Sequence, residues 1–216
     1  MKKTKFKRLF VLILSLIFIS SIPLTEALAC TNYYDYNCRY LIGGVGNWGS
    51  NNRAYYISNN ASGYTDLIQK AVNSWVYTTN EGPHVSTPIS IVRTTNYSSS
   101  VFDVYCGSPL SAPSGALGLT EMYCFGNVPV GINGNTPTSN WEYAVITLIE
   151  PNFSNIPARY SLSANDNKQA TIAHEFGHAM GLSHTLKNWC IMCTFDNDRN
   201  TLRANTEDLA VINHLY

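Results

Sequence analysis

Hydrophobic and polar residues alternate or cluster in short stretches along the chain, and most of these stretches have the length of β-strands. β-Branched and aromatic residues gather in this way at residues 53–58, 89–93, 101–105, 117–125 and 143–149, which predicts strands. From Thr65 to about Tyr77, apolar residues instead recur at the spacing of a helix that buries one face. Residues 30–50 and 126–140 are predicted to be irregular, because they are rich in turn-forming residues. The order of strand, helix, several strands and two further helices predicts an α+β or α/β fold.

The N-terminus has the three-part pattern of a secretory signal peptide. Basic side chains crowd the first eight residues, residues 9–19 are almost wholly apolar, and Ala27-Leu28-Ala29 places small residues where a signal peptidase reads them. The alternative is a transmembrane anchor, which needs roughly 20 apolar residues, and this run is shorter. We therefore expect a signal peptide at residues 1–29, one mature domain at residues 30–216, and a secreted, extracellular protein.

Charge excludes two kinds of partner. Loss of the signal peptide removes five basic residues and Glu26 from a chain with 14 basic and 14 acidic residues, so the mature net charge is near −4. Such a domain offers no basic surface to nucleic acid or to an anionic membrane. No second apolar stretch is long enough to span a bilayer, so no membrane contact is expected after signal cleavage.

Six cysteines remain in the mature chain, and an even number in an exported protein indicates disulfides. Closeness in sequence favours three pairs, while other pairings stay open: Cys30–Cys38, Cys106–Cys124 and Cys190–Cys193. Cys30 would also be the first mature residue, so its lipidation is an alternative. Lipidation would leave an odd cysteine unpaired, which is unfavourable in an exported chain.

The chemistry is concentrated in residues 171–184, TIAHEFGHAMGLSH, where His174, Glu175, His178, Gly181 and His184 form the pattern HExxHxxGxxH. Residues four apart on a helix lie on one face, so the first two histidines can present imidazole nitrogens to one zinc ion. The glutamate between them points to a neighbouring face, which is the metalloprotease arrangement. Short motifs occur by chance, but three of the five histidines fall within this segment.

Gly181 has a mechanical role in this pattern. Glycine adopts the left-handed conformation that ends a helix, which lets the chain return His184 to the same ion. Three neutral histidines leave a fourth position open for water, as in catalytic zinc sites. Glu175 is then the expected general base, taking a proton as water attacks a carbonyl carbon.

These residues resemble the zinc consensus of the metzincin metallopeptidases. The match is closest to the matrixin type, where a Gly-Leu pair precedes the third ligand region as Gly181-Leu182 does here. Met192 lies eight residues beyond His184 and is similar to the methionine turn found beneath the metal. Residues 205–216 are similar to the last helix of matrixin catalytic domains, and the resemblance is strongest over residues 170–216.

The resemblance implies an α+β fold with a twisted, mostly parallel sheet, an antiparallel edge strand, a zinc-binding active-site helix and a C-terminal helix. It implies that the substrate pairs with an edge strand, for which residues 117–123 are the candidate. The pocket for the residue after the cut would lie between the zinc helix and the segment following Met192. One catalytic Zn²⁺ is expected. A second, structural zinc is not expected, because His84 is the only histidine upstream of the motif.

We therefore expect a zinc-dependent endopeptidase that acts as a monomer on protein or peptide substrates. Two alternatives are a zinc-dependent hydrolase of a non-protein amide and a secreted binding module in which zinc is structural. Glu175 argues against the second alternative, because a structural zinc needs only its ligands.

Asp196 and Asp198 offer a calcium site, although two loop carboxylates are usually just solvated. Tyr143 or Tyr160 could stabilise an oxyanion, but their spacing selects neither.

Overall fold

The computed structural model describes residues 33–47, 51–79 and 82–216. Residues Tyr34–Tyr216 form one compact unit. The expected signal peptide at residues 1–29, and Cys30 with its pairing or lipidation, lie outside the described residues and stay predictions. In the part of the chain that is described, no helix is both long enough and apolar enough to cross a bilayer.

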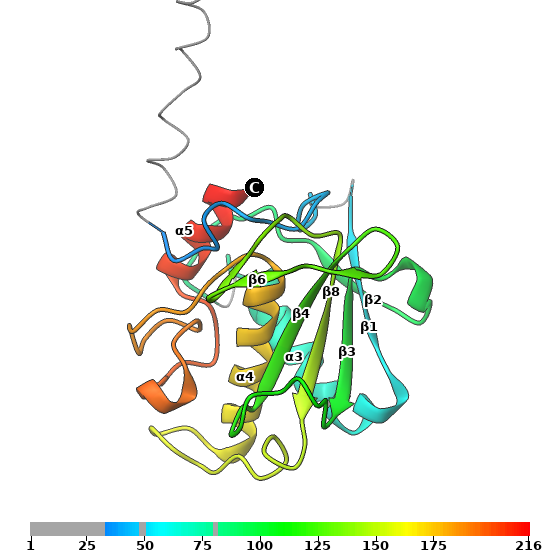
Figure 1. Cartoon of the computed structure of the whole chain (residues 1–216). Helices are drawn as coiled ribbons and strands as arrows, with labels where there is room; N and C mark the ends of the chain where they lie inside the picture. The colour runs from blue at the N-terminus through cyan, green and yellow to red at the C-terminus, as the bar shows by residue number, and fades with distance from the viewer. Residues whose placement is uncertain (1–32, 48–50, 80–81) are drawn as a thin grey trace, which may run out of the picture. The chain divides into compact units, whose positions relative to one another are not determined.

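The main sheet has the strand order β2-β1-β3-β8-β4-β5 (Figure 1). Its members are β1 (Arg53–Ile57), β2 (Ile91–Thr94), β3 (Phe102–Gly107), β4 (Gly118–Cys124), β5 (Val128–Pro129) and β8 (Tyr143–Ile149). The strands β2, β1, β3 and β8 run parallel, while β4 is antiparallel to β8 and β5 is antiparallel to β4. The predicted α+β fold, with a mostly parallel sheet and an antiparallel strand near its edge, is confirmed.

The segment 126–140, predicted to be irregular, contains short β-pairings besides its loops. β5 pairs with the end of β4 through Tyr123 and Cys124. β6 (Ile132–Asn133) and β7 (Thr136–Pro137) form a separate two-stranded hairpin. Gly134 opens the two-residue turn between them with a φ of 62°, a conformation that glycine adopts readily and that hairpin turns require. Strands of only two residues, such as β5, β6 and β7, are too short to show an alternation of apolar and polar residues in the sequence.

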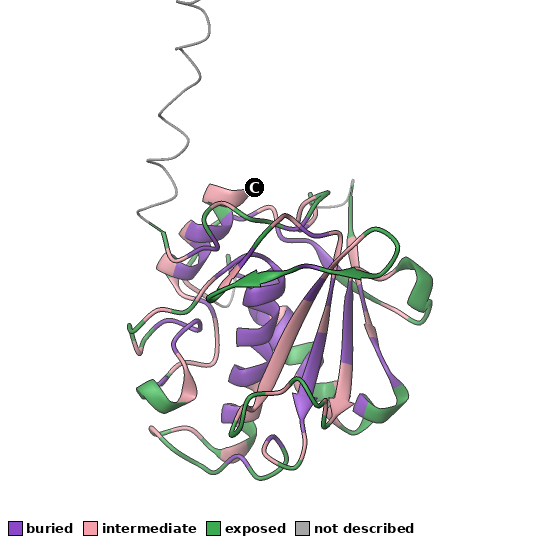
Figure 2. Ribbon diagram, in the orientation of Figure 1, coloured by how far each residue is buried: buried purple, intermediate pink, exposed green. Residues whose placement is uncertain are grey.

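Within the described residues, three α-helices accompany the sheet: α3 (Thr65–Val76), α4 (Ala164–Ala179) and α5 (Thr206–Leu215). Ser163 begins α4 with a capping box, in which its hydroxyl accepts from the backbone of Asp166 and the Asp166 carboxylate accepts in return. α4 packs against α3, β4 and β8 and is buried over most of its length (Figure 2). Since this helix has little exposed surface, its side chains are held firmly by their neighbours.

Two contacts fix α4 between its neighbours. The Trp75 indole on α3 donates a hydrogen bond of 2.9 Å to the Ala173 carbonyl. The Phe176 ring lies edge-on to the rings of Tyr55 on β1 and Phe102 on β3, with centroids 6.0 and 5.8 Å apart. The helix that carries the HExxH motif is therefore anchored on both its α3 side and its sheet side.

The predicted pairing of Cys106 with Cys124 is wrong, because both thiols are free. Cys106 is on β3 opposite Leu148, whereas Cys124 ends β4 next to Tyr123, which pairs with Tyr143. β8 lies between the two strands, and Leu148 and Tyr143 are separated by roughly 17 Å along it. A disulfide needs Cα atoms less than about 7 Å apart.

The predicted Cys190–Cys193 disulfide is also absent, and both thiols are buried and free. Cys193 Sγ lies 3.2 Å from the Asn197 carbonyl oxygen, while Cys190 Sγ accepts from Asn205 Nδ2 at 3.4 Å. The two sulfur atoms therefore have separate partners, and the turn is held by the Cys193 N–H donating to the Cys190 carbonyl at 3.1 Å.

Candidate metal centre

The end of α4 is built so that the chain reverses directly after the second histidine of the motif. Gly181 has a φ of 108°, and a side chain there would meet Leu215 and the Arg39 carbonyl within 3.0 Å. The Gly181 N–H donates to the His178 carbonyl and the Leu182 N–H to the Gly177 carbonyl, each at 3.0 Å. These are the two bonds of a Schellman motif, and they redirect the chain so that His184 faces the helix.

The three motif histidines converge on one point. His184 Nε2 lies 3.1 Å from His178 Nε2 and 3.1 Å from His174 Nε2. Nitrogens bound to one tetrahedral zinc at 2.0–2.1 Å are themselves about 3.3 Å apart. The cluster is one of the residue groups in the described part of the chain that could hold a metal ion.

The Nδ1 atoms of His174 and His178, which point away from the centre of the cluster, indicate why a metal ion fits among the three histidines. His174 Nδ1 lies 2.8 Å from the Ile191 carbonyl oxygen, and His178 Nδ1 lies 2.8 Å from the Leu182 carbonyl oxygen. A carbonyl only accepts, so each Nδ1 must carry the proton, and each Nε2 presents a lone pair to the centre. Lone pairs about 3 Å apart repel one another unless a cation lies between them, so the donor set fits zinc.

Burial keeps these histidines neutral. Desolvation lowers the pKa of His178 and of His184 to about 4 and lowers the pKa of His174 well below its usual value. Neutral imidazole is the form that binds zinc. His174 and His178 are buried, while His184 is exposed toward solvent, so one side of the cluster is open.

Glu175 is held beside the histidines and not among them. Its Oε2 accepts a hydrogen bond of 2.7 Å from the Thr120 hydroxyl on β4. Burial raises the pKa of the Glu175 carboxyl to about 7, while the Thr120 hydrogen bond, His184 and Arg199 act in the opposite direction. A carboxyl with a pKa near neutrality can both take up and release a proton.

Met192 is completely buried beneath the histidine helix. A Cβ atom on Gly177, between the two helical histidines, would lie 2.3 Å from Met192 Sδ and 3.2 Å from Trp75 Cζ2. Glycine at position 177 is therefore what allows the methionine turn to approach the helix so closely. The turn in return supplies the Ile191 carbonyl that orients His174.

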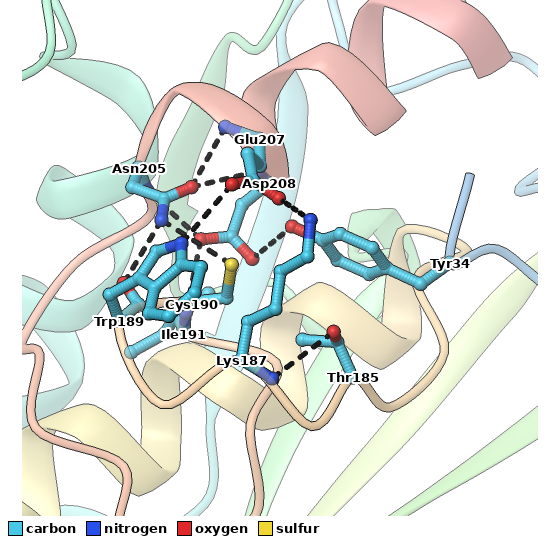
Figure 3. Close-up of polar contacts among 9 residues, drawn as sticks. All are labelled: Tyr34, Thr185, Lys187, Trp189, Cys190, Ile191, Asn205, Glu207 and Asp208. Carbon is cyan, nitrogen blue, oxygen red and sulfur yellow. Dashed lines mark hydrogen bonds and ion pairs between the residues drawn. The ribbon is translucent and has the colours of Figure 1, made fainter. Parts of the chain in front are cut away.

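A buried carboxylate on α5 supports the methionine turn (Figure 3). Asp208 Oδ2 accepts from the Ile191 N–H at 3.0 Å and from the Asn205 N–H at 2.9 Å. Asp208 Oδ1 accepts from the Tyr34 hydroxyl at 2.8 Å. Ile191 thus connects Asp208 with His174. Its N–H donates to Asp208, and its carbonyl accepts from His174.

Two pockets flank the cluster, and both are lined by Glu175, His184, Ala116 and Gly118. The larger, about 610 Å³, extends along β4 on the His178 side. The smaller, about 350 Å³, lies on the His174 side, between α4 and the segment that follows Met192. The smaller pocket occupies the position expected for the residue after the cut.

Several residues of the site carried no sequence signal. Thr120 contacts Glu175 from a strand 55 positions away, and the Tyr36 hydroxyl lies 2.8 Å from His178 Nδ1. Asp208 and Arg199 belong to no motif that marks them as part of the site. These contacts join distant parts of the chain, so no local pattern could identify them.

Other candidate residues lie elsewhere. Tyr143 donates a hydrogen bond to Asn127, and the Tyr160 ring packs against Phe195; neither residue lines the two pockets. The exposed carboxylates of Asp196 and Asp198 each lie 3.9 Å from the Arg159 guanidinium. That cation already balances part of their charge, and the calcium site stays an untested alternative.

A mixed sheet, a buried histidine helix and a three-histidine cluster with an adjacent glutamate are typical of zinc metallopeptidases. Comparison with protein-family models makes this specific, since the model for matrixin peptidases matches residues 52–216. The chain therefore belongs to the matrixin family, whose members are zinc-dependent endopeptidases. No curated protein matches the chain.

Proposed function

We propose that this matrixin is an exported, monomeric endopeptidase with one catalytic zinc, held by His174, His178 and His184. The convergence of three neutral imidazoles beside a buried carboxylate supports this proposal most directly. Zinc bound there supplies a Lewis acid that polarises a carbonyl and makes water more acidic.

The residues of the chain supply the proton transfers. Glu175 takes a proton from the attacking water onto its carboxylate while the water oxygen bonds to the carbonyl carbon. It then passes that proton to the leaving amine nitrogen as the C–N bond breaks. Thr120 is a positioning residue, because its hydroxyl holds one carboxylate oxygen of Glu175 and leaves the other to face the substrate.

The substrate is expected to lie along β4. β5 pairs with this strand at Tyr123 and Cys124, and the Val130 N–H after β5 donates to the Met122 carbonyl. The earlier part of β4, at Gly118, Leu119 and Thr120, lines the larger pocket. An extended peptide can pair with such an edge through its backbone, which tolerates many side chains. Side-chain selection then depends on the pockets.

The proposal is tested with protein from residue 30 onward and a peptide library of mixed sequence, with new termini read by mass spectrometry. We expect cleavages that stop on addition of a chelator and return with Zn²⁺. The export prediction is checked separately by sequencing the N-terminus of protein recovered from the medium. Zinc-loaded protein that cuts no peptide in the library would contradict the endopeptidase proposal.

Substitution of Gly118 by alanine is expected to lower kcat about a hundredfold without loss of zinc. A Cβ there would lie 2.6 Å from Glu175 Cγ and Oε1, so the carboxylate must move, and misplacement of about 1 Å can reduce a rate by about that factor. Gly107→Ala is the matched control, since its Cβ would meet nothing within 4 Å. Equal activities for the two variants would show that this position of Glu175 is unimportant.

A further inference from the structure

The smaller pocket has an arginine in its wall. Arg199 lines it together with Thr171, His174 and Glu175 from α4 and with Thr194, Phe195 and Asp196 from the segment after Met192. Arg199 is only 2% exposed, which is unusual for a charged side chain without a paired carboxylate.

The guanidinium is incompletely satisfied. Its Nη2 donates to the Thr171 hydroxyl at 2.8 Å, and its Nη1 reaches the Cys193 carbonyl at 3.5 Å. Its Nε is buried and has no hydrogen-bond partner within the described part of the chain. An arginine has five N–H donors in a fork that matches a carboxylate. Here Nη1 and Nη2 each have an acceptor, whereas Nε has none among the described residues.

The positive charge is also unbalanced. Burial lowers the pKa of Arg199 to about 10, so the side chain remains charged at neutral pH. None of the ion pairs between described residues includes it. Asp196, at the same pocket, is 93% exposed and lies near Arg159 instead. Glu175 attracts Arg199 from a distance, but its carboxylate is bound to Thr120.

We propose that Arg199 selects substrates with aspartate or glutamate directly after the cleaved bond, by donating hydrogen bonds to that side-chain carboxylate. The inference rests on the proposed endopeptidase function and specifies its substrate class. A buried cation without a counter-ion is destabilising by itself, and a carboxylate in the pocket would supply the missing acceptor and the missing negative charge together.

A purely structural role for Arg199 makes a different prediction. If it only ties α4 to the segment after Met192, its loss should lower the cleavage of all peptides by a similar factor. If it recognises a carboxylate, its loss should change the ratio between acidic and neutral substrates. The test therefore measures ratios.

The first measurement uses wild-type protein and the mixed-sequence library. We expect aspartate and glutamate to be enriched at least about fivefold immediately after the cut. Two results would overturn the assignment of Arg199. One is cleavage without enrichment of aspartate and glutamate, and the other is their enrichment in the residue before the cleaved bond instead of the residue after it. An absence of chelator-sensitive cuts would instead contradict the proposed function, so the two failures are distinguishable.

The second measurement uses two peptides that differ only by glutamate or glutamine after the cut. We expect kcat/KM to favour glutamate by about tenfold or more in the wild type, by less in Arg199→Lys, and by about twofold or less in Arg199→Gln. Arg93→Gln, which removes an exposed arginine on β2, should keep the wild-type ratio. An Arg199→Gln variant that is folded and zinc-loaded and retains the preference would overturn the inference.

A binding measurement removes the dependence on turnover. In the Glu175→Ala background, fluorescence anisotropy of the same two labelled peptides should show tighter binding of the glutamate peptide, and Arg199→Gln should abolish that difference. If Arg199→Gln does not fold, Arg199→Lys supplies the comparison, and a wild type without a preference for the glutamate peptide overturns the proposal by itself. Equal binding of both peptides together with equal kcat/KM would refute it.

Discussion

Glu175→Gln is expected to lower kcat/KM for peptide cleavage by about 10³-fold while zinc content stays at the wild-type level. Glutamine keeps the size of the side chain and can still contact Thr120, but it cannot take up a proton from water. General-base catalysis contributes roughly 10²–10⁴-fold, and in this cleft Glu175 is the carboxylate placed beside the three histidines.

The measurement combines steady-state kinetics on one cleaved peptide with metal analysis of the same protein. Glu142→Gln is the control, since it removes a carboxylate that does not line the pockets. Retained activity in Glu175→Gln would exclude Glu175 as the base. Joint loss of activity and zinc would mean that the carboxylate helps to hold the metal.

Local geometry explains why the convergence of the three histidines could be predicted from sequence. His174 and His178 are one turn apart on a helix, and Gly181 marks the point where the helix must end. Each inference depends on residues within a few positions of one another. The strand at Tyr143–Ile149 was predicted with its observed bounds for a similar reason: a run of β-branched and aromatic residues in a buried strand is easily recognised.

Pairings between distant segments could not be predicted in this way. Cys106 and Cys124 are close in sequence, but β8, which enters the sheet later in the chain, separates their strands. The same limit hid Thr120 and Asp208, whose roles depend on which strand or helix end lies next to α4. Sequence indicates which residues can carry the chemistry, whereas the topology determines which residues hold them in place.

The second large effect concerns stability and involves Asp208. We expect Asp208→Asn to lower the free energy of unfolding by about 2–4 kcal/mol, because the completely buried carboxylate accepts three hydrogen bonds from Ile191, Asn205 and Tyr34. Bonds to a charged acceptor are each worth about 1.5–3 kcal/mol. The asparagine side chain has only one oxygen that can accept these bonds. Its NH₂ group would face at least one of the three donors and cannot accept a hydrogen bond from it. Tm should fall by roughly 5–10 °C.

The same substitution should weaken zinc binding, which a general loss of stability would not explain. Asp208 holds the Ile191 N–H, and the Ile191 carbonyl accepts from His174 Nδ1; loss of such outer contacts typically reduces metal affinity by 10–100-fold. Glu207→Gln is the matched control, since Glu207 is the neighbouring residue on α5 but pairs at the surface with Lys187 and Trp189 (Figure 3). Competition with a chromophoric chelator, below the Tm of both variants, compares their affinities. If Asp208→Asn binds zinc as tightly as Glu207→Gln does, the methionine turn positions His174 without help from α5.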